Sequence, residues 1–144
     1  VWFAHDVQPP ATPGFGIGRR VTLAEAKSLS ELVGCIKAHL GVPHVWVAPC
    51  ADGPDRPVKS VALCAGSGGS VLKDAPADLL WTGEMSHHDI LAANARGAHV
   101  VLCGHTNTER GFLEVFRTML LEQLGGQGVE VRVSKVDCDP LTVW

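Results

Sequence analysis

The sequence predicts an α/β domain on a largely parallel or mixed sheet, with helices on both faces of that sheet. Short apolar runs alternate with amphipathic segments along the chain, a pattern typical of strands joined by helical crossovers. The 144 residues are about one domain's worth, and 46% of them are apolar, which is enough for a core. We expect residues 14–144 to form this single domain, and residues 1–13 to be an irregular lead-in at a cut edge.

The first helix is predicted from a start signal and a stop signal. Residues 14–21 are glycine-rich and predict a short, bent strand. Thr22 followed by Glu25 has the spacing of a capping box, so the helix is expected to begin there. Apolar residues then recur at helical spacing up to Gly41, which is a typical C-terminal cap.

The rest of the chain alternates between the two element types. Strands are predicted over residues 44–48, 58–65, 78–82 and 99–103, a short helix or turn over 71–77, a helix over 86–97 with Ser86 and Asp89 as a capping pair, and a long helix over 107–124. The apolar residues of the long helix that we expect to face the core are Phe112, Val115, Phe116, Met119, Leu120 and Leu124. Residues 129–136 alternate strictly and predict a half-exposed strand at a sheet edge.

The residues that could carry chemistry follow three of these strands. They lie in the loops 66–70, 83–89 and 104–109. In a parallel sheet the carboxyl ends of neighbouring strands share one rim, where ligands bind. The sequence therefore predicts that these three loops meet in space.

The first loop, AGSGGS, is rich in glycine. Gly66, Ser67 and Gly68 could bring backbone N–H groups close to an anion of a substrate. The loop lacks the Gly-Lys-Ser/Thr ending of a phosphate-binding P-loop, and a flexible turn explains the glycines equally well.

The second loop, TGEMSHHD, places Glu84 directly after a strand and His87 and His88 in the first turn of a helix. Adjacent helical positions point about 100° apart, so at most one of the two histidines faces a common site readily. The alternatives are a solvated helix start for the histidines and a favourable interaction with the helix dipole for Asp89.

The third loop, CGHTNTERGF, places His105 and Glu109 four residues apart. If both lie on a helix they share a face, and together they could bind a divalent cation such as zinc, manganese, iron, cobalt or nickel. The rival interpretation is a capping box, in which Glu109 bonds back to the N–H of Thr106. Two ligands also fall short of the three or four that are usual.

Composition excludes several classes of protein. The formal net charge is −3, from 12 basic and 15 acidic residues, with no clustered basic face for direct nucleic-acid binding. No apolar run reaches the ~18 residues of a membrane span. The five cysteines are scattered, which indicates free thiols in a reducing compartment rather than a disulfide framework.

Four stretches taken together resemble one known family. VALCAGSGGSVL, ADLLWTGEMSHHDILAA, VVLCGHTNTERGFL and the closing DCDPLTVW, in this order, are similar to the NGG-interacting-factor-three-like (Nif-three-like) family, and most of all to its animal members. The resemblance covers roughly residues 14–144. It implies a Nif-three-like fold and a chain that is the C-terminal portion of a longer protein.

The resemblance also implies a site. Family members bind a pair of divalent metal ions and assemble into rings, so a homo-oligomer is expected. The family's GHxxTE ligands match His105 and Glu109, and the acid of its TG(D/E) motif matches Glu84. The other ligands come from an N-terminal half, so this chain is expected to hold only part of the site. His87 and His88 do not take over that role.

Two functions follow from the resemblance. The first is a metal-binding regulatory protein, cytoplasmic and nuclear, that acts as a transcriptional corepressor through protein partners. The second is a metal-dependent hydrolase of a nucleotide-like or phosphate-bearing small molecule, similar to GTP cyclohydrolase type two. In the second, Glu84 and His88 would be catalytic and His87 would join the glycine loop in substrate binding.

Overall fold

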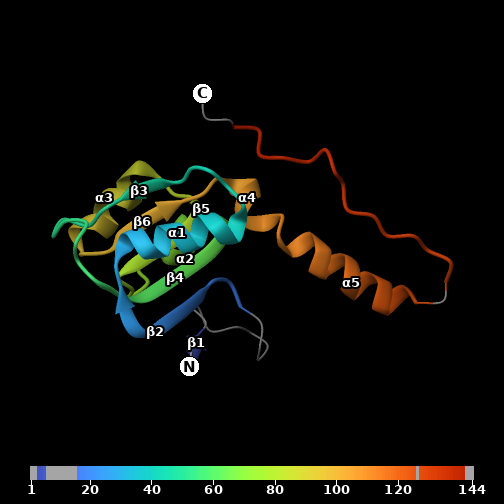
Figure 1. The fold of residues 1–144 in the computed structure, drawn as a ribbon, viewed down its shortest axis with the longest axis horizontal. Coiled ribbons are helices and arrows are strands. Elements are labelled where there is room, and N and C mark those ends of the chain that lie inside the picture. Colours follow the sequence, from blue (N-terminus) through green and yellow to red (C-terminus); the bar gives the residue numbers. More distant parts are fainter. Residues whose placement is uncertain (1–2, 6–15, 126, 142–144) are drawn as a thin grey trace.

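A six-stranded mixed sheet forms the centre of the computed structural model, which describes residues 3–5, 16–125 and 127–141 (Figure 1). Its strands are β1 (Phe3–His5), β2 (Arg19–Lys27), β3 (Trp46–Ala48), β4 (Val58–Ser67), β5 (Leu79–Glu84) and β6 (His99–Leu102), in the order β1-β2-β4-β5-β6-β3. The pairs β4–β5 and β5–β6 are parallel and the others are antiparallel. The predicted mixed α/β sheet is thus confirmed, with β1 lying inside the segment predicted as an irregular lead-in.

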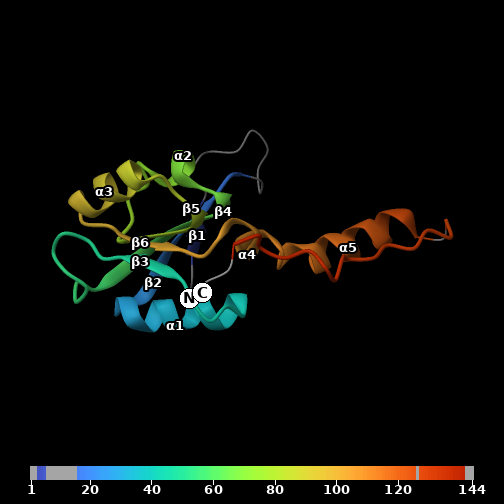
Figure 2. The same ribbon diagram turned by 90° about the horizontal axis from the view of Figure 1, so that it is seen from above.

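Helices cover both faces of the sheet, as predicted. The helices are α1 (Leu29–Leu40), α2 (Gly69–Leu72), α3 (His87–Ala95), α4 (His105–Glu109) and α5 (Phe112–Leu124). Figure 2 shows α1 on one side of the sheet and α2 and α3 on the other. Neighbouring residues of each strand therefore enter different cores: Leu79 and Val101 pack on the α1 side, whereas Leu80 and Val100 pack on the α2 and α3 side.

The first helix begins six residues later than predicted. Thr22 lies within β2, where it pairs with Ser60 of β4, and the predicted capping box at Thr22 is therefore wrong. The next sequence with the same spacing forms the box instead: the Ser28 hydroxyl accepts the N–H of Glu31, and the Glu31 carboxylate accepts the N–H of Ser28. Pairing of β2 with its neighbours outweighs the helix propensity of its residues. The predicted cap at Gly41 is confirmed.

The predicted long helix over 107–124 is two helices. The helix is interrupted at Arg110–Gly111. Helix α5 then projects away from the sheet, together with the segment that follows it (Figure 1). The prediction that its apolar side chains face the core is wrong, because α5 has no buried residue and Phe112, Val115, Phe116 and Met119 are 45–56% exposed. The apolar side chains do lie at helical spacing, but nothing within the described residues buries them.

The predicted edge strand over 129–136 is also wrong. These residues contain no strand and run beside α5, where the Arg117 side chain donates a hydrogen bond to the carbonyl of Val131 at 2.9 Å. An alternating sequence forms a strand only where a sheet edge is within reach, and the edge next to β6 is already taken by β3.

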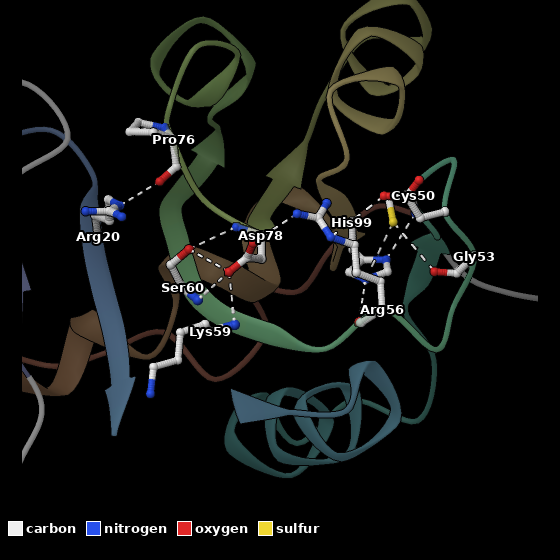
Figure 3. Close-up of polar contacts among 10 residues, drawn as sticks. Arg20, Cys50, Gly53, Arg56, Lys59, Ser60, Pro76, Asp78 and His99 are labelled. Atoms are coloured by element: carbon white, nitrogen blue, oxygen red, sulfur yellow. Dashed lines mark hydrogen bonds and ion pairs between the residues drawn. The ribbon is translucent and has the colours of Figure 1, made fainter. Parts of the chain in front are cut away.

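Polar side chains fasten the amino ends of the parallel strands (Figure 3). Asp78 accepts the N–H groups of Lys59 and Ser60 and the hydroxyl of Ser60, at 2.8–3.0 Å. His99 is fully buried: its Nδ1 accepts the N–H of Cys50 at 3.0 Å, and its Nε2 donates to the carbonyl of Arg56 at 3.1 Å. Both nitrogens are thus engaged by the backbone, and His99 fixes the loop before β4.

Candidate metal centre

The three predicted loops meet at one rim of the sheet. The N–H of Gly104, after β6, donates to the carbonyl of Gly83 at the end of β5. The N–H of Gly66, at the end of β4, donates to the Thr108 hydroxyl of α4 at 2.8 Å. The three loops that carry the candidate residues are therefore close in space, because the carboxyl ends of β4, β5 and β6 lie side by side.

His105 lies at the centre of this rim, between two carboxylates. Its Nδ1 is 3.1 Å from Oε2 of Glu84, and its Nε2 is 3.4 Å from Oε1 of Glu109. The three side chains are 43–53% exposed, so the imidazole and both carboxylates are open to solvent and to ligands. The structure therefore brings together the predicted metal ligands and one of the predicted catalytic residues.

The rival capping box does not form. Helix α4 begins at His105, with Gly104 as its N-cap and no side-chain cap hydrogen bond. His105 and Glu109 are consequently both helical, and the i, i+4 geometry places them on one face. The Glu109 carboxylate is oriented toward the imidazole rather than toward the N–H of Thr106.

Glycine allows the backbone to approach this pair closely. Gly66 has φ +64°, and a Cβ there would lie 2.5 Å from Oε1 of Glu109 and 3.1 Å from Nε2 of His105. A Cβ on Gly83 would lie 2.7 Å from the carbonyl of Gly66 and 2.8 Å from that of Gly104. Two of the glycines in the motifs are thus required by packing at the rim.

The carboxylates favour the charged form of His105. The hydrogen bond that the ring N–H of His105 donates to Glu84 raises the pKa of His105, the charge of Glu109 acts in the same direction, and burial opposes both only in part. The imidazole is therefore a good partner for positive charge, whether that charge is a proton or a metal ion.

The described residues alone do not enclose an ion. Within ranges 16–125 and 127–141, no three His, Cys, Asp or Glu side chains are placed to hold a metal together. The reason is geometric: Glu84 and Glu109 meet different nitrogens of the same ring, so a single ion can contact His105 together with only one of them. A metal site at His105 and Glu109 would therefore need ligands beyond these two.

The other predicted site residues are less tightly grouped. The N–H of Gly66 is used by Thr108 and that of Gly68 by the Thr82 hydroxyl at 3.0 Å, so an anion would have to displace these acceptors. Anion binding by Gly66, Ser67 and Gly68 stays a prediction. His87 and His88 are exposed at the start of α3, with their rings edge to face at 5.8 Å, and their roles also stay predictions.

Thr108 is a site residue that the sequence argument missed. Its hydroxyl accepts the N–H of Gly66 and donates to the carbonyl of His105 at 2.8 Å, which ties α4 to the end of β4. The signal available was its position within GHTNTE, between the two candidate ligands.

Known proteins match this chain over nearly its whole length. The family model described as Duf34/NIF3 (NGG1p interacting factor 3) matches residues 4–140. The chain belongs to the DUF34/NIF3 family. It is 50% identical over 139 residues to NIF3-like protein 1 of Rattus norvegicus, covering 96% of this chain and 37% of that protein. It is 46% identical over 133 residues to NGG1-interacting factor 3 of Saccharomyces cerevisiae, covering 89% of this chain and 45% of that protein.

Solved structures agree with this DUF34/NIF3 assignment. A Bacillus cereus protein related to NIF3 superposes with a TM-score of 0.77 at 25% identity, over 90% of this chain and 36% of that one. The chain thus spans less than half the length of these relatives. Within its described part, no helix is both long and apolar enough to cross a membrane.

Proposed function

We propose that this chain supplies half of a divalent-metal site in a regulatory DUF34/NIF3 protein, with His105 and Glu109 as the ligands. The observation that carries the proposal is the contact of Nε2 of His105 with Oε1 of Glu109, at 3.4 Å on one face of α4. An ion between these atoms would replace that contact. Imidazole with carboxylate suits zinc, manganese, iron, cobalt or nickel.

Glu84 has a defined part in this proposal. Metal-binding histidines usually donate their other ring N–H to a carboxylate, which fixes the tautomer and the ring orientation. Oε2 of Glu84 lies 3.1 Å from Nδ1 of His105, which is the position that such a carboxylate occupies. Glu84 therefore orients the ligand histidine and leaves Nε2 free to bind the ion.

The site needs further ligands, because two fall short of the usual three or four. A homo-oligomer or the rest of a longer chain would supply them, and the unpartnered apolar face of α5 supports association. Phe112 and Phe116 stack there at 6.1 Å, with 56% and 45% of their surfaces exposed. Exposed apolar patches of this kind mark surfaces for association.

The regulatory part of the proposal rests on the yeast relative. That protein is named an NGG1-interacting factor, which describes binding to another protein. We accordingly propose a corepressor role through protein partners in cytoplasm and nucleus, with a metal site that partner binding does not require.

A second candidate function, hydrolysis of a nucleotide-like or phosphate-bearing substrate, is favoured by the open carboxylate of Glu84. That side chain is 51% exposed beside the proposed ligand His105 and could also handle a proton. A bound pair of metal ions would supply an activated water and electrostatic stabilisation of the reacting oxygens. In this alternative His88 assists Glu84, while His87 and the Gly66–Gly68 loop meet the substrate.

The experiment is metal analysis of the purified protein after dialysis against each ion, by mass spectrometry and titration calorimetry. His105→Ala and Glu109→Ala are expected to lose bound metal while the far-ultraviolet circular dichroism is unchanged. His99 is no suitable control, because it is buried, so the exposed His87→Ala serves as the matched histidine variant. Metal content unchanged by both ligand substitutions would refute the site.

Partner binding separates the two functions. If the protein is regulatory, His105→Ala keeps its affinity for the partner protein in pull-down measurements even though metal is lost. If it is a hydrolase, metal-dependent turnover appears in a phosphate-release screen and disappears in Glu84→Gln as well as in His105→Ala.

A further inference from the structure

A cavity of about 590 Å³ opens beside Glu84, at the carboxyl ends of β5 and β6. Three parts of the chain form its walls: the connection from α1 to β3, the rim loops after β5 and β6, and the segment after α5. That last segment lies beyond α5 in the sequence and contributes Cys138, Asp139 and Leu141. The volume lies in the roughly 300–1,000 Å³ range of sites for small molecules.

One wall of the cavity is apolar and carries an aromatic ring. Trp46, on the edge strand β3, is 53% exposed although it lies in a sheet. Leu102, Met85 and Leu141 line the cavity near it. An exposed indole face next to aliphatic side chains is a surface on which a flat ring can stack.

The charge of the cavity is of one sign. Glu84 and Asp139 line it, and no Lys or Arg does so among the described residues. Glu84 is paired with His105, but no ion pair holds Asp139 among the described residues, so the carboxylate of Asp139 repels an anionic group and attracts a cationic group or one rich in N–H donors. The cavity itself is therefore unsuited to a free phosphate or carboxylate.

Asp139 has a hydrogen-bonding capacity that the protein does not use. Its Oδ1 accepts the N–H of Leu141 at 3.0 Å, whereas its Oδ2 is buried and has no hydrogen-bond partner among the described residues. Oδ2 lies against Gly104, where a Cβ would be 2.8 Å away. A buried acceptor without a donor is destabilising, so a ligand gains that energy if the carboxylate turns toward the cavity and Oδ2 accepts the ligand's donor.

We propose that this cavity binds a ring-containing organic molecule that carries a cationic or N–H-rich group. The ring stacks on Trp46 and the N–H group bonds to the carboxylate of Asp139. Such a molecule would lie beside Glu84, whose carboxylate contacts Nδ1 of His105. The inference goes beyond the proposed function and does not require a metal, which keeps the two separately testable.

Benzamidine is the probe, because it joins a flat ring to an amidinium group. Binding is followed in metal-free buffer with a chelator, by titration of the amide spectrum of isotope-labelled protein. We expect saturable shifts at Gly104 and at the Asn107 side chain. Asp139→Asn, which keeps the shape of the side chain, should weaken binding roughly tenfold by removing a charge-assisted bond. Trp46→Ala should weaken it about threefold or more.

Two comparisons make the test decisive without any variant. Benzoate has the same ring with the opposite charge, and methylguanidinium has the charge without the ring, so each should bind much more weakly than benzamidine. Equal binding of benzoate, shifts spread away from the cavity, or unchanged affinity in Asp139→Asn would overturn the inference. If benzamidine does not bind but metal binding is normal, the metal proposal stands and the cavity proposal is refuted. If metal binding is absent but benzamidine binds as expected, the cavity proposal stands and the metal proposal is refuted.

Discussion

Replacing Asp78 by alanine tests the polar cluster that fastens the amino ends of β4 and β5. One oxygen, Oδ2, accepts three hydrogen bonds from Lys59 and Ser60, and the side chain is 23% exposed. A hydrogen bond to a charged group contributes about 1.5–3 kcal/mol, but three bonds to one oxygen are not additive and water would reach some of the freed donors. We therefore expect the free energy of unfolding to fall by about 3 kcal/mol.

The assay is urea unfolding at pH 7, followed by circular dichroism. The exposed Asp74→Ala, four residues earlier, is the matched control and should change stability by less than about 0.5 kcal/mol. A loss of less than about 1 kcal/mol for Asp78→Ala would refute the reasoning. Metal binding at the opposite rim should survive in the fraction that stays folded.

The stability that Asp78 contributes should also depend on pH. Burial alone would raise the pKa of Asp78, but the hydrogen bonds from Ser60 and Lys59 and the charge of Arg56 together lower it. A carboxyl group with a lowered folded-state pKa stabilises the protein above its unfolded pKa of about 3.9, and this contribution is lost as pH falls below that value. The stability difference between wild type and Asp78→Ala should shrink below about pH 4.

Three further substitutions or reactions have definite outcomes. Ser28→Ala removes the capping box of α1 and should cost about 1 kcal/mol in urea unfolding, whereas Ser28→Asp should be nearly neutral. Gly83→Ala places a Cβ against two backbone carbonyls and should cost about 1–3 kcal/mol and weaken metal binding, and normal metal affinity would contradict the rim geometry. Burial raises the pKa of Cys103, so iodoacetamide at pH 8 should label exposed Cys138 and spare Cys103 until the protein is unfolded, as peptide mass mapping will show.

The rim could be predicted from the sequence because parallel strands leave little freedom. Once β4, β5 and β6 are identified from their apolar runs, the loops after them must meet, and Glu84 and His105 do so. The role of Glu109 could not be decided, because it lies three residues after Thr106, as in a capping box, and four after His105, as in a ligand pair on one helix face. The structure excludes the capping box by starting α4 at His105, and the ligand role of Glu109 stays a prediction.

The errors arose where local patterns compete with packing at a distance. Thr22 and Ser28 begin equivalent capping boxes, and only the pairing of β2 with β4 selects Ser28. The apolar stripe of α5 predicted burial, but periodicity says only that a face is apolar and not what covers it. Asp139 was overlooked because its place beside Gly104 depends on the path of the chain after α5.

Anomalous diffraction from crystals grown with zinc or manganese tests the central claim most directly. We predict a metal peak between Nε2 of His105 and the carboxylate of Glu109, with Nδ1 of His105 still bonded to Glu84 and the remaining ligands from outside the described residues. A peak at His87 and His88, or no peak while the His105–Glu109 contact persists at saturating metal, would contradict the account.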